Sequence, residues 1–258
     1  MKPKALVLLA YGTNRDHDVA EALTLSGAEP KIVPLNALRE GMKYWSDFQM
    51  FVLPGGFSYA DALGAGKLLA IDMQAYFADE IRKFVEAGKP VIGICNGFQA
   101  LVKSGILLRN RDARMENNDS VATLTFNASG HFECRWVTLK PVSQTCIWTS
   151  GLTDLIECPI AHGEGNFQAV NHTPLSDQVA LIYARPDGSP AGGDYPANPN
   201  GSVLDIAGLT NSRGNVLGLM PHPENHIHPW QHPQRRRGVV RGSGLSLFKN
   251  GVKYAEGL

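Results

Sequence analysis

Apolar positions in the first hundred residues fall alternately into unbroken runs and into segments with the spacing of a helix. Helical spacing is seen at Asp16–Ser26 and Asp79–Ala87, and Gly88 is well suited to end the second segment. Unbroken apolar runs are typical of strands covered on both faces of a parallel sheet. The runs lie at Lys4–Ala10, Lys31–Leu35, Gln49–Leu53 and Pro90–Ile94. Strands that alternate with helices predict an α/β fold with a doubly wound, mostly parallel sheet flanked by helices, whose ligands bind at the carboxyl ends of the strands.

The pattern changes after about residue 110, where apolar and polar residues alternate over short stretches such as His131–Leu139 and Val203–Leu209. This alternation predicts antiparallel strands added to the sheet. Gly188–Ser202 is so rich in Gly, Pro and Asn that we expect a loop, either solvated or functional. No internal repeat or linker divides the sequence, so we expect a single domain over residues 1–258.

Charge and length narrow the classes of ligand. The sequence balances 24 Lys and Arg residues against 24 Asp and Glu residues, so no long-range field attracts nucleic acid or an anionic membrane. No apolar segment approaches the roughly 20 residues that span a bilayer, and the short apolar run near the N-terminus has no small-residue cleavage site. The four cysteines lack the spacing of a metal site, and we expect reduced thiols in a cytoplasmic protein with a small-molecule ligand.

The segment Gly93–Gly97, with the sequence Gly-Ile-Cys-Asn-Gly, places Cys95 where a predicted strand gives way to a helix. A sharp turn of this kind strains the central residue and presents its side chain, and the following helix N-terminus favours a thiolate. The sequence therefore predicts that Cys95 is a nucleophile with an exposed side chain. The alternative is a small buried cysteine whose neighbouring glycines serve packing.

A candidate base follows the strand-like segment Asn215–Leu219. Residues two apart in an extended chain face the same way, so Glu224 is placed to hold one ring nitrogen of His222 while the other faces Cys95. By itself this tripeptide would more often be surface loop. Together with the cysteine turn it predicts a catalytic triad.

Donors for an oxyanion are expected at the end of the third strand, in Leu53–Ser58. Its adjacent glycines can bring backbone N–H groups close to a substrate. The N–H groups of Gly56 and of Asn96, the residue after the nucleophile, are the candidates. A plain tight turn is the alternative.

Cys95, His222 and Glu224 in this chain order, with the Pro-Gly-Gly turn and the GICNGFQ segment, resemble the triad-type (class I) glutamine amidotransferases. Within that family, six segments resemble the glutaminase subunits of phosphoribosylformylglycinamidine synthase, an enzyme of purine biosynthesis. These segments are Gly12–Asp16, Leu53–Leu63, Pro159–Phe167, Asn198–Ser202, Ile206–Asn211 and Gly218–Asn225.

The resemblance implies a flavodoxin-like fold and hydrolysis of L-glutamine to glutamate and ammonia through a thioester on Cys95. It implies that a PurL-like synthetase subunit, in an assembly that can include a small PurS-like bridging subunit, receives the ammonia and converts formylglycinamide ribonucleotide to the amidine. ATP and magnesium are expected on that partner and no cofactor or metal in this chain. The residues expected to contact glutamine are Gly55, Phe57, Gln99, His162 and Gly163.

Two positions depart from the family's usual residues. Arg15 stands where the family often has a cysteine, and Asn225 where it often has an arginine. Both lie outside the triad, so they bear on partner contacts rather than on chemistry.

The segment after Glu224 is unusually rich in histidine and arginine. A zinc site built from His222, His226, His228 and His232 is an alternative that we disfavour, because zinc would occupy the imidazole that the triad needs. Arg235–Arg237 is placed to dock a partner, although a short basic run is more often a solvated face.

Two other functions fit part of the sequence. A stand-alone cysteine hydrolase would share the nucleophile turn but show no preference for glutamine. A non-catalytic binding subunit would keep the fold with an idle triad, and the presence of all three triad residues speaks against it.

Overall fold

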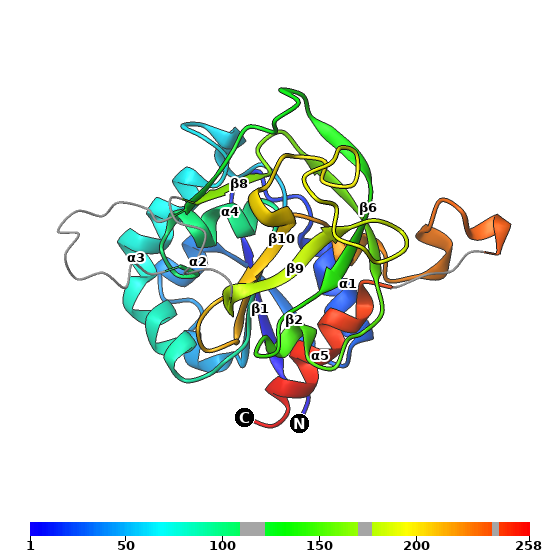
Figure 1. The fold of residues 1–258 in the computed structure, drawn as a ribbon. Coiled ribbons are helices and arrows are strands. Elements are labelled where there is room, and N and C mark those ends of the chain that lie inside the picture. The colour runs from blue at the N-terminus through cyan, green and yellow to red at the C-terminus, as the bar shows by residue number, and fades with distance from the viewer. Residues whose placement is uncertain (109–121, 170–176, 239–242) are drawn as a thin grey trace.

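The computed structural model describes residues 1–108, 122–169, 177–238 and 243–258. Within these residues a nine-stranded sheet runs through the molecule in the order β2-β1-β3-β4-β11-β10-β9-β6-β7, and β5 pairs with β8 in a separate antiparallel ribbon (Figure 1). The strands are β1 Lys4–Leu9, β2 Glu29–Pro34, β3 Met50–Leu53, β4 Val91–Ile94, β5 Ala122–Thr125, β6 Glu133–Pro141, β7 Ile156–His162, β8 Asn166–Ala169, β9 Val179–Ala184, β10 Ile206–Thr210 and β11 Val216–Leu219.

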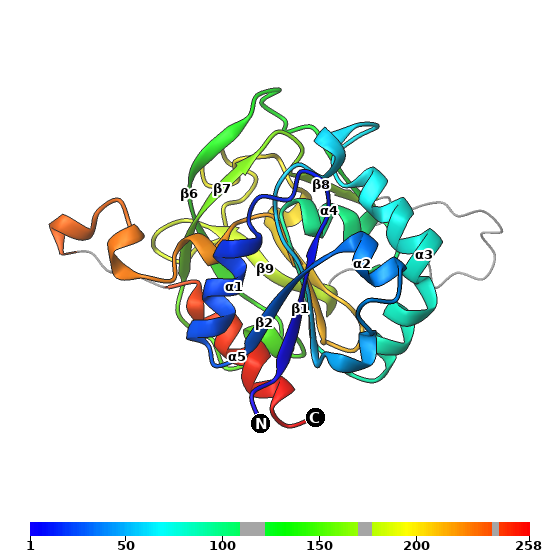
Figure 2. The ribbon, with the colours of Figure 1, turned by 180° about the vertical axis from the view of Figure 1, so that it is seen from behind.

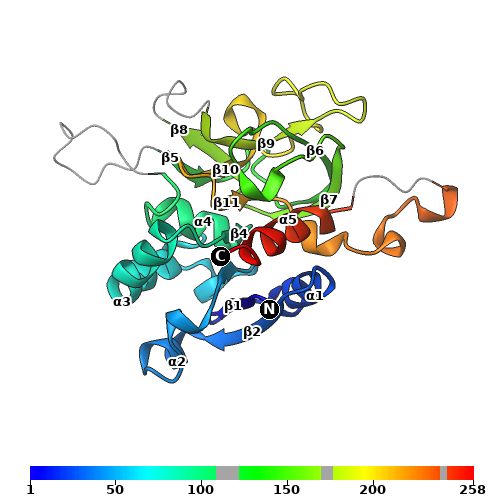
Figure 3. The ribbon, with the colours of Figure 1, turned by 90° about the horizontal axis from the view of Figure 1, so that it is seen from below.

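Five α-helices accompany the strands in the described part of the chain, α1 Asp16–Leu25, α2 Leu35–Arg39, α3 Lys67–Glu86, α4 Asn96–Lys103 and α5 Leu245–Ala255. Viewed from below, α3 and α4 lie on one face of the sheet and α1 and α5 on the other (Figure 3). Short 3₁₀ turns lie in the connections, at η1 Trp45–Asp47, η2 Ser58–Asp61, η3 Ile147–Thr149, η5 Val203–Asp205, η6 Pro223–Asn225, η7 Pro229–Gln231 and η8 Arg235–Arg237.

The first half of the sheet is parallel and the second half antiparallel. β1 pairs in parallel with β2 and β3, β3 with β4, and β4 with β11, whereas the pairings from β11 onward to β7 are antiparallel. All four residues of β3 and of β4 are buried, because helices cover both faces (Figure 2). The predicted fold class is confirmed, including the added antiparallel strands.

Helix α3 begins 12 residues before the predicted segment at Asp79, since it starts at Lys67. The missed half continues the same apolar stripe, in which Leu69, Met73 and Phe77 precede Ile81 at four-residue intervals and are all buried. Polar residues lie between these positions, so the stripe is not recognised when only a short stretch of the sequence is considered. None of the helices in the described ranges is long and apolar enough to cross a membrane.

Segment Gly188–Ser202 contains no helix and no strand, as its composition predicts. Its two ends differ in environment, since Asp194 and Tyr195 are exposed while Asn198 and Asn200 are buried. A solvated connection does not describe the second half of this loop.

Helix α4 packs very closely on β3. A Cβ atom on Gly97 would lie 2.1 Å from the carbonyl oxygen of Leu53, so no side chain fits there without moving backbone. We expect Gly97→Ala to lower the free energy of unfolding by about 1–3 kcal/mol, the usual range for overpacking a dense core. Gly257→Ala is the matched control, because its nearest contact would be an ordinary 3.5 Å. Equal denaturant midpoints for the two variants would contradict this account.

Candidate functional site

Three neighbouring strands of the parallel half end at the same edge of the sheet. In their register Leu53 of β3 lies opposite Gly93 of β4, and Leu219 of β11 lies opposite Ile94. The residues that follow each strand therefore converge. These segments contain Gly55 and Gly56, Cys95, and His222, the sequence-predicted chemical groups.

Cys95 occupies the turn between β4 and α4 with φ 51° and ψ −106°, a conformation that residues with side chains rarely adopt. Its N–H donates to the carbonyl oxygen of Leu219 at 2.8 Å, so the parallel neighbour holds the turn. The strained turn agrees with the prediction, but the expected exposure does not, because only 4% of Cys95 is accessible. The end of β7 covers it, and the carbonyl oxygen of Ala161 lies 3.9 Å from Sγ.

His222 and Glu224 form a buried pair in which Nδ1 of the imidazole lies 2.7 Å from Oε1 of the carboxylate. The expected extended geometry is wrong. The 3₁₀ turn η6 begins at Pro223 and folds Glu224 back beneath His222. The N–H of His222 donates to the carbonyl oxygen of Pro159 at 2.8 Å, which anchors this turn to β7.

The buried imidazole of His222 favours its protonated form. Desolvation lowers its pKa, but the charges of Glu224 and Cys95, with side-chain hydrogen bonds to both, outweigh desolvation and raise the pKa to about 10. The arrangement can supply both a nucleophile and a proton.

Gly55 lies against both side chains. A Cβ atom on it would lie 2.7 Å from Cε1 of His222 and 3.4 Å from Cβ of Cys95, so only glycine leaves room between them. Gly56 has φ +138°, and its own Cβ would lie 2.7 Å from the carbonyl oxygen of Gly12. Within the described residues the N–H groups of Gly56 and Asn96 donate no hydrogen bond, which leaves both for an incoming oxygen atom.

The side chain of Asn96 ties helix α4 to the turn η2. Its Oδ1 accepts the N–H of Ser58 at 3.2 Å, and its Nδ2 donates to Asp61 and to Gln99, both at 3.1 Å. Tyr59, Ala60 and Asp61 all have positive φ near 54°. A segment this strained persists only where its surroundings hold it, and Asn96 is one such contact.

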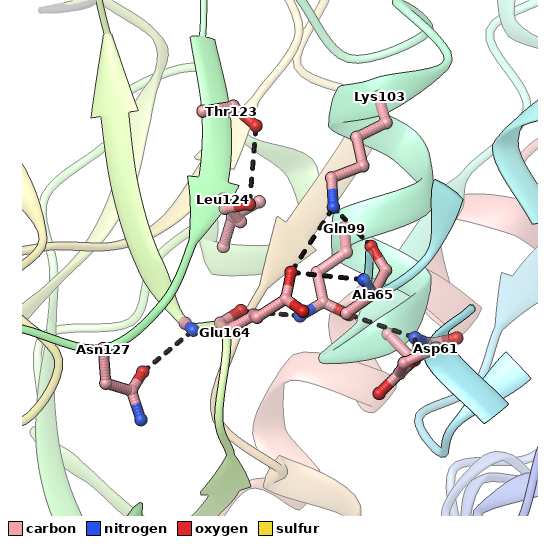
Figure 4. Close-up of polar contacts among 10 residues, drawn as sticks. Asp61, Ala65, Gln99, Lys103, Thr123, Leu124, Asn127 and Glu164 are labelled. Atoms are coloured by element: carbon pink, nitrogen blue, oxygen red, sulfur yellow. Dashed lines mark hydrogen bonds and ion pairs between the residues drawn. The ribbon is translucent and has the colours of Figure 1, made fainter. Parts of the chain in front are cut away.

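A second bridge joins α4 to the turn between β7 and β8. Nε2 of Gln99 donates to the carbonyl oxygen of Glu164 at 2.6 Å, and the carboxylate of Glu164 accepts the N–H of Ala65 at 3.2 Å (Figure 4). Lys103 lies 3.8 Å from this carboxylate and donates to the carbonyl oxygen of Ala65. Both the nitrogen and the oxygen of the Gln99 amide thus form hydrogen bonds within the protein. Contact of Gln99 with substrate stays a prediction.

His162 ends β7 and is buried. Its Nδ1 lies 3.1 Å from Oδ1 of Asn127, and burial together with the charge of His222 lowers its pKa to about 3. The neighbouring Gly163 lies near Phe132, whose ring stacks on Phe57 at 6.4 Å. These aromatic rings are half exposed at the rim of the site.

Several residues that hold the site in place are not predicted from the sequence. Ser202 accepts the N–H of Phe167 and donates to the carbonyl oxygen of Gly165, so the loop ending at Ser202 holds the turn that follows His162. Asp205 in turn accepts three hydrogen bonds from that loop. The matched segments Pro159–Phe167 and Asn198–Ser202 were the available signal, although nothing in their sequences indicates that they touch.

The histidines beyond the pair have structural partners. His232 lies 2.8 Å from the carboxylate of Glu157, and the rings of His226 and His232 pack edge-on against Trp136. In the described ranges no group of three or more His, Cys, Asp or Glu side chains is arranged to hold a metal ion. The disfavoured zinc site therefore gains no support.

The two departures from the family pattern meet at one residue. Arg15 pairs with the carboxylate of Asp18 at 3.1 Å, and Nδ2 of Asn225 donates to the same oxygen at 2.9 Å. Arg235–Arg237 lies in the exposed turn η8.

The raised pKa of His222 predicts a pH-dependent stability. The proton is bound more tightly in the folded state, so the stabilisation is complete below the ordinary pKa of 6.5 and is lost as pH rises toward about 10. We expect the stability difference between the wild type and His222→Gln to shrink by at least about 2 kcal/mol between roughly pH 6 and pH 9.5. Urea unfolding of both proteins at the two pH values measures this difference in stability. Replacement of the exposed His17 by glutamine is the control. A difference independent of pH would refute the charged pair.

Comparison with known proteins agrees with this geometry. Residues 2–255 match the family model of the CobB/CobQ-like glutamine amidotransferase domain. The chain is 52% identical to phosphoribosylformylglycinamidine synthase subunit PurQ of Treponema denticola, over 98% of this chain and 99% of that protein. It is 41% identical to the PurQ subunit of Dehalococcoides mccartyi, over 98% of each. A chain of the solved PurLQS structure from Thermotoga maritima superposes with a TM-score of 0.75 at 32% identity, over 98% of this chain and 99% of that one. The chain belongs to the glutamine amidotransferase family and, within it, to the PurQ subunits of phosphoribosylformylglycinamidine synthase.

Proposed function

We propose that this chain hydrolyses L-glutamine with Cys95 as nucleophile, His222 as proton carrier and Glu224 as the group that orients His222. The observation that carries the proposal is the convergence of Cys95, the His222–Glu224 pair and Gly55 at one edge of the sheet. Triads of this kind are recognised by geometry and roles.

In the first half of the reaction the Cys95 thiolate attacks the side-chain amide carbon of glutamine, and the carbonyl electron pair moves onto oxygen. The N–H groups of Gly56 and Asn96 stabilise that oxyanion. The His222 imidazolium gives its proton to the amide nitrogen, the carbon–nitrogen bond breaks, and ammonia leaves a γ-glutamyl thioester.

In the second half a water molecule attacks the thioester while the neutral His222 takes its proton. The carbon–sulfur bond breaks, glutamate leaves, and the thiolate and imidazolium are restored. Glu224 keeps Nδ1 of the ring occupied, so that Nε2 remains the proton-carrying atom toward Cys95.

The proposed glutamine contacts are Gly55, Phe57, Gln99, His162 and Gly163. Gly55 and His162 have the strongest support, because the first packs against both His222 and Cys95 and the second follows the residue whose carbonyl lies near Sγ. Gln99 supports the site through Asn96 and Glu164.

The proposed acceptor of the ammonia is a PurL-like synthetase, with a PurS-like subunit bridging the two, as the PurLQS assembly of the Thermotoga maritima relative suggests. In this proposal the synthetase binds ATP and magnesium, and the assembly works in the cytoplasm on formylglycinamide ribonucleotide. Exposed Phe57, Leu63 and Phe132, near the candidate site, offer apolar surface for this contact.

A glutamine analogue that carries an alkylating group tests the substrate and the nucleophile together. We expect label on the buried Cys95 and protection by excess L-glutamine, with the exposed Cys134 as internal measure of indiscriminate alkylation. Mass spectrometry of peptides reads the result. Label indifferent to glutamine would favour a general cysteine hydrolase, and absence of label in the presence of the synthetase would favour an idle triad.

Replacement of the nucleophile separates chemistry from assembly. Cys95→Ala should lower glutamine hydrolysis at least about 1,000-fold while binding to the synthetase is unchanged, because alanine fits the same space. Cys134→Ala is the control, since that cysteine is exposed. Loss of assembly in Cys95→Ala, measured by size-exclusion chromatography, would assign Cys95 a structural role instead.

A further inference from the structure

The hydrogen bonds of Asn127 fix the tautomer of His162. Nδ2 of Asn127 donates to the carbonyl oxygens of His131 at 2.9 Å and His162 at 2.8 Å, so this atom is the amide nitrogen. Oδ1 then accepts the N–H of Gly165 at 2.9 Å and must also accept from Nδ1 of His162 at 3.1 Å. The proton of a neutral His162 therefore lies on Nδ1, and Nε2 carries a lone pair.

That lone pair has no partner among the described residues. Nε2 of His162 is buried and makes no hydrogen bond, while the residue as a whole is 2% exposed. An unmade hydrogen bond in a buried place is costly and usually marks a position that a ligand or a water molecule fills.

His162 lies beside the proposed chemistry. The carbonyl oxygen of Ala161, the preceding residue, is 3.9 Å from Sγ of Cys95, and His162 interacts electrostatically with His222. Gly165 packs on the ring, where a Cβ atom would lie 2.1 Å from Cε1 and 2.6 Å from Nε2. Because residue 165 is a glycine, no Cβ atom covers the unpartnered Nε2.

The substrate and the product of the proposed reaction differ in the group that would meet this acceptor. The glutamine carboxamide carries N–H donors, one of which can satisfy Nε2 while the carbonyl oxygen faces the N–H groups of Gly56 and Asn96. Glutamate has a second carboxylate oxygen in that place, and two lone pairs repel. A site built to receive an N–H group rejects an analogue that lacks it.

We propose that His162 is a specificity-determining residue whose Nε2 accepts a hydrogen bond from the side-chain amide of glutamine and disfavours glutamate, which promotes product release. This role rests on the proposed function. Burial and the positive charge of His222 lower the pKa of His162 to about 3. The ring is therefore neutral at neutral pH, and its Nε2 accepts a hydrogen bond and cannot donate one to a carboxylate.

The test compares KM for glutamine with the inhibition constant of glutamate, in the full chain assembled with its synthetase. In the wild type we expect glutamate to bind at least about 100-fold more weakly than glutamine. In His162→Gln the amide can turn its NH₂ group toward a carboxylate. The inhibition constant of glutamate divided by KM for glutamine should therefore fall at least about 10-fold. An unchanged ratio in an active His162→Gln variant overturns the proposal.

Ser202→Ala is the matched control for a purely structural effect. It loosens the same turn through Gly165 and Phe167 but leaves the acceptor in place, so both constants should move together. If the wild type neither hydrolyses glutamine nor is labelled at Cys95, the proposed function itself fails. Hydrolysis with an unchanged ratio in His162→Gln removes only the role of His162.

A ligand series avoids any folding defect in the variants. Calorimetry on the assembled Cys95→Ala protein should give the affinity order glutamine, then glutamate γ-methyl ester, then glutamate, with at least about 10-fold between the first two. The ester matches glutamine in shape but has no N–H donor. Equal affinity of the ester and glutamine would overturn the proposal.

Discussion

The candidate site depends on the hydrogen bonds between β4 and β11. Their parallel register places the end of each strand at the same level, and the N–H of Cys95 continues the pairing by one residue to the carbonyl oxygen of Leu219. That bond supports a backbone conformation that costs on the order of 1–3 kcal/mol for a residue with a side chain. Without the neighbouring strand the turn would relax, and the sulfur atom would no longer point toward His222.

Burial then determines what these side chains can do. Two charges removed from water are stable only when they are paired closely, and His222 meets Glu224 at 2.7 Å inside the protein. The same low-dielectric surroundings act in the opposite direction on His162, whose pKa is lowered by burial and by the charge of His222. Two histidines close to one another thus hold opposite protonation states, one able to give a proton and the other able only to accept a hydrogen bond.

The sequence was informative where the physics is local. Unbroken apolar runs located β1 to β4, four of the five strands that pair in parallel, and the glycines around Cys95 located its turn, because both signals lie within a few residues. Errors arose where distant segments decide the outcome. Cys95 is buried by β7, far along the chain, and Glu224 reaches His222 through a 3₁₀ turn that the flanking prolines alone do not specify. The partnership of Asn127 with His162 joins residues 35 apart, and no local pattern indicates it.

The loop that supplies Gly56 is connected to both sides of the site. Asn96 holds η2 from helix α4 through the N–H of Ser58. Glu164, in the β7–β8 turn, accepts the N–H of Ala65 (Figure 4). Since η2 is strained and lies beside the exposed Phe57, a force applied at that surface would act directly on the backbone that carries the Gly56 N–H. The proposed oxyanion donor and the apolar rim are parts of one segment, so in this proposal contact with a partner and stabilisation of the transition state are coupled.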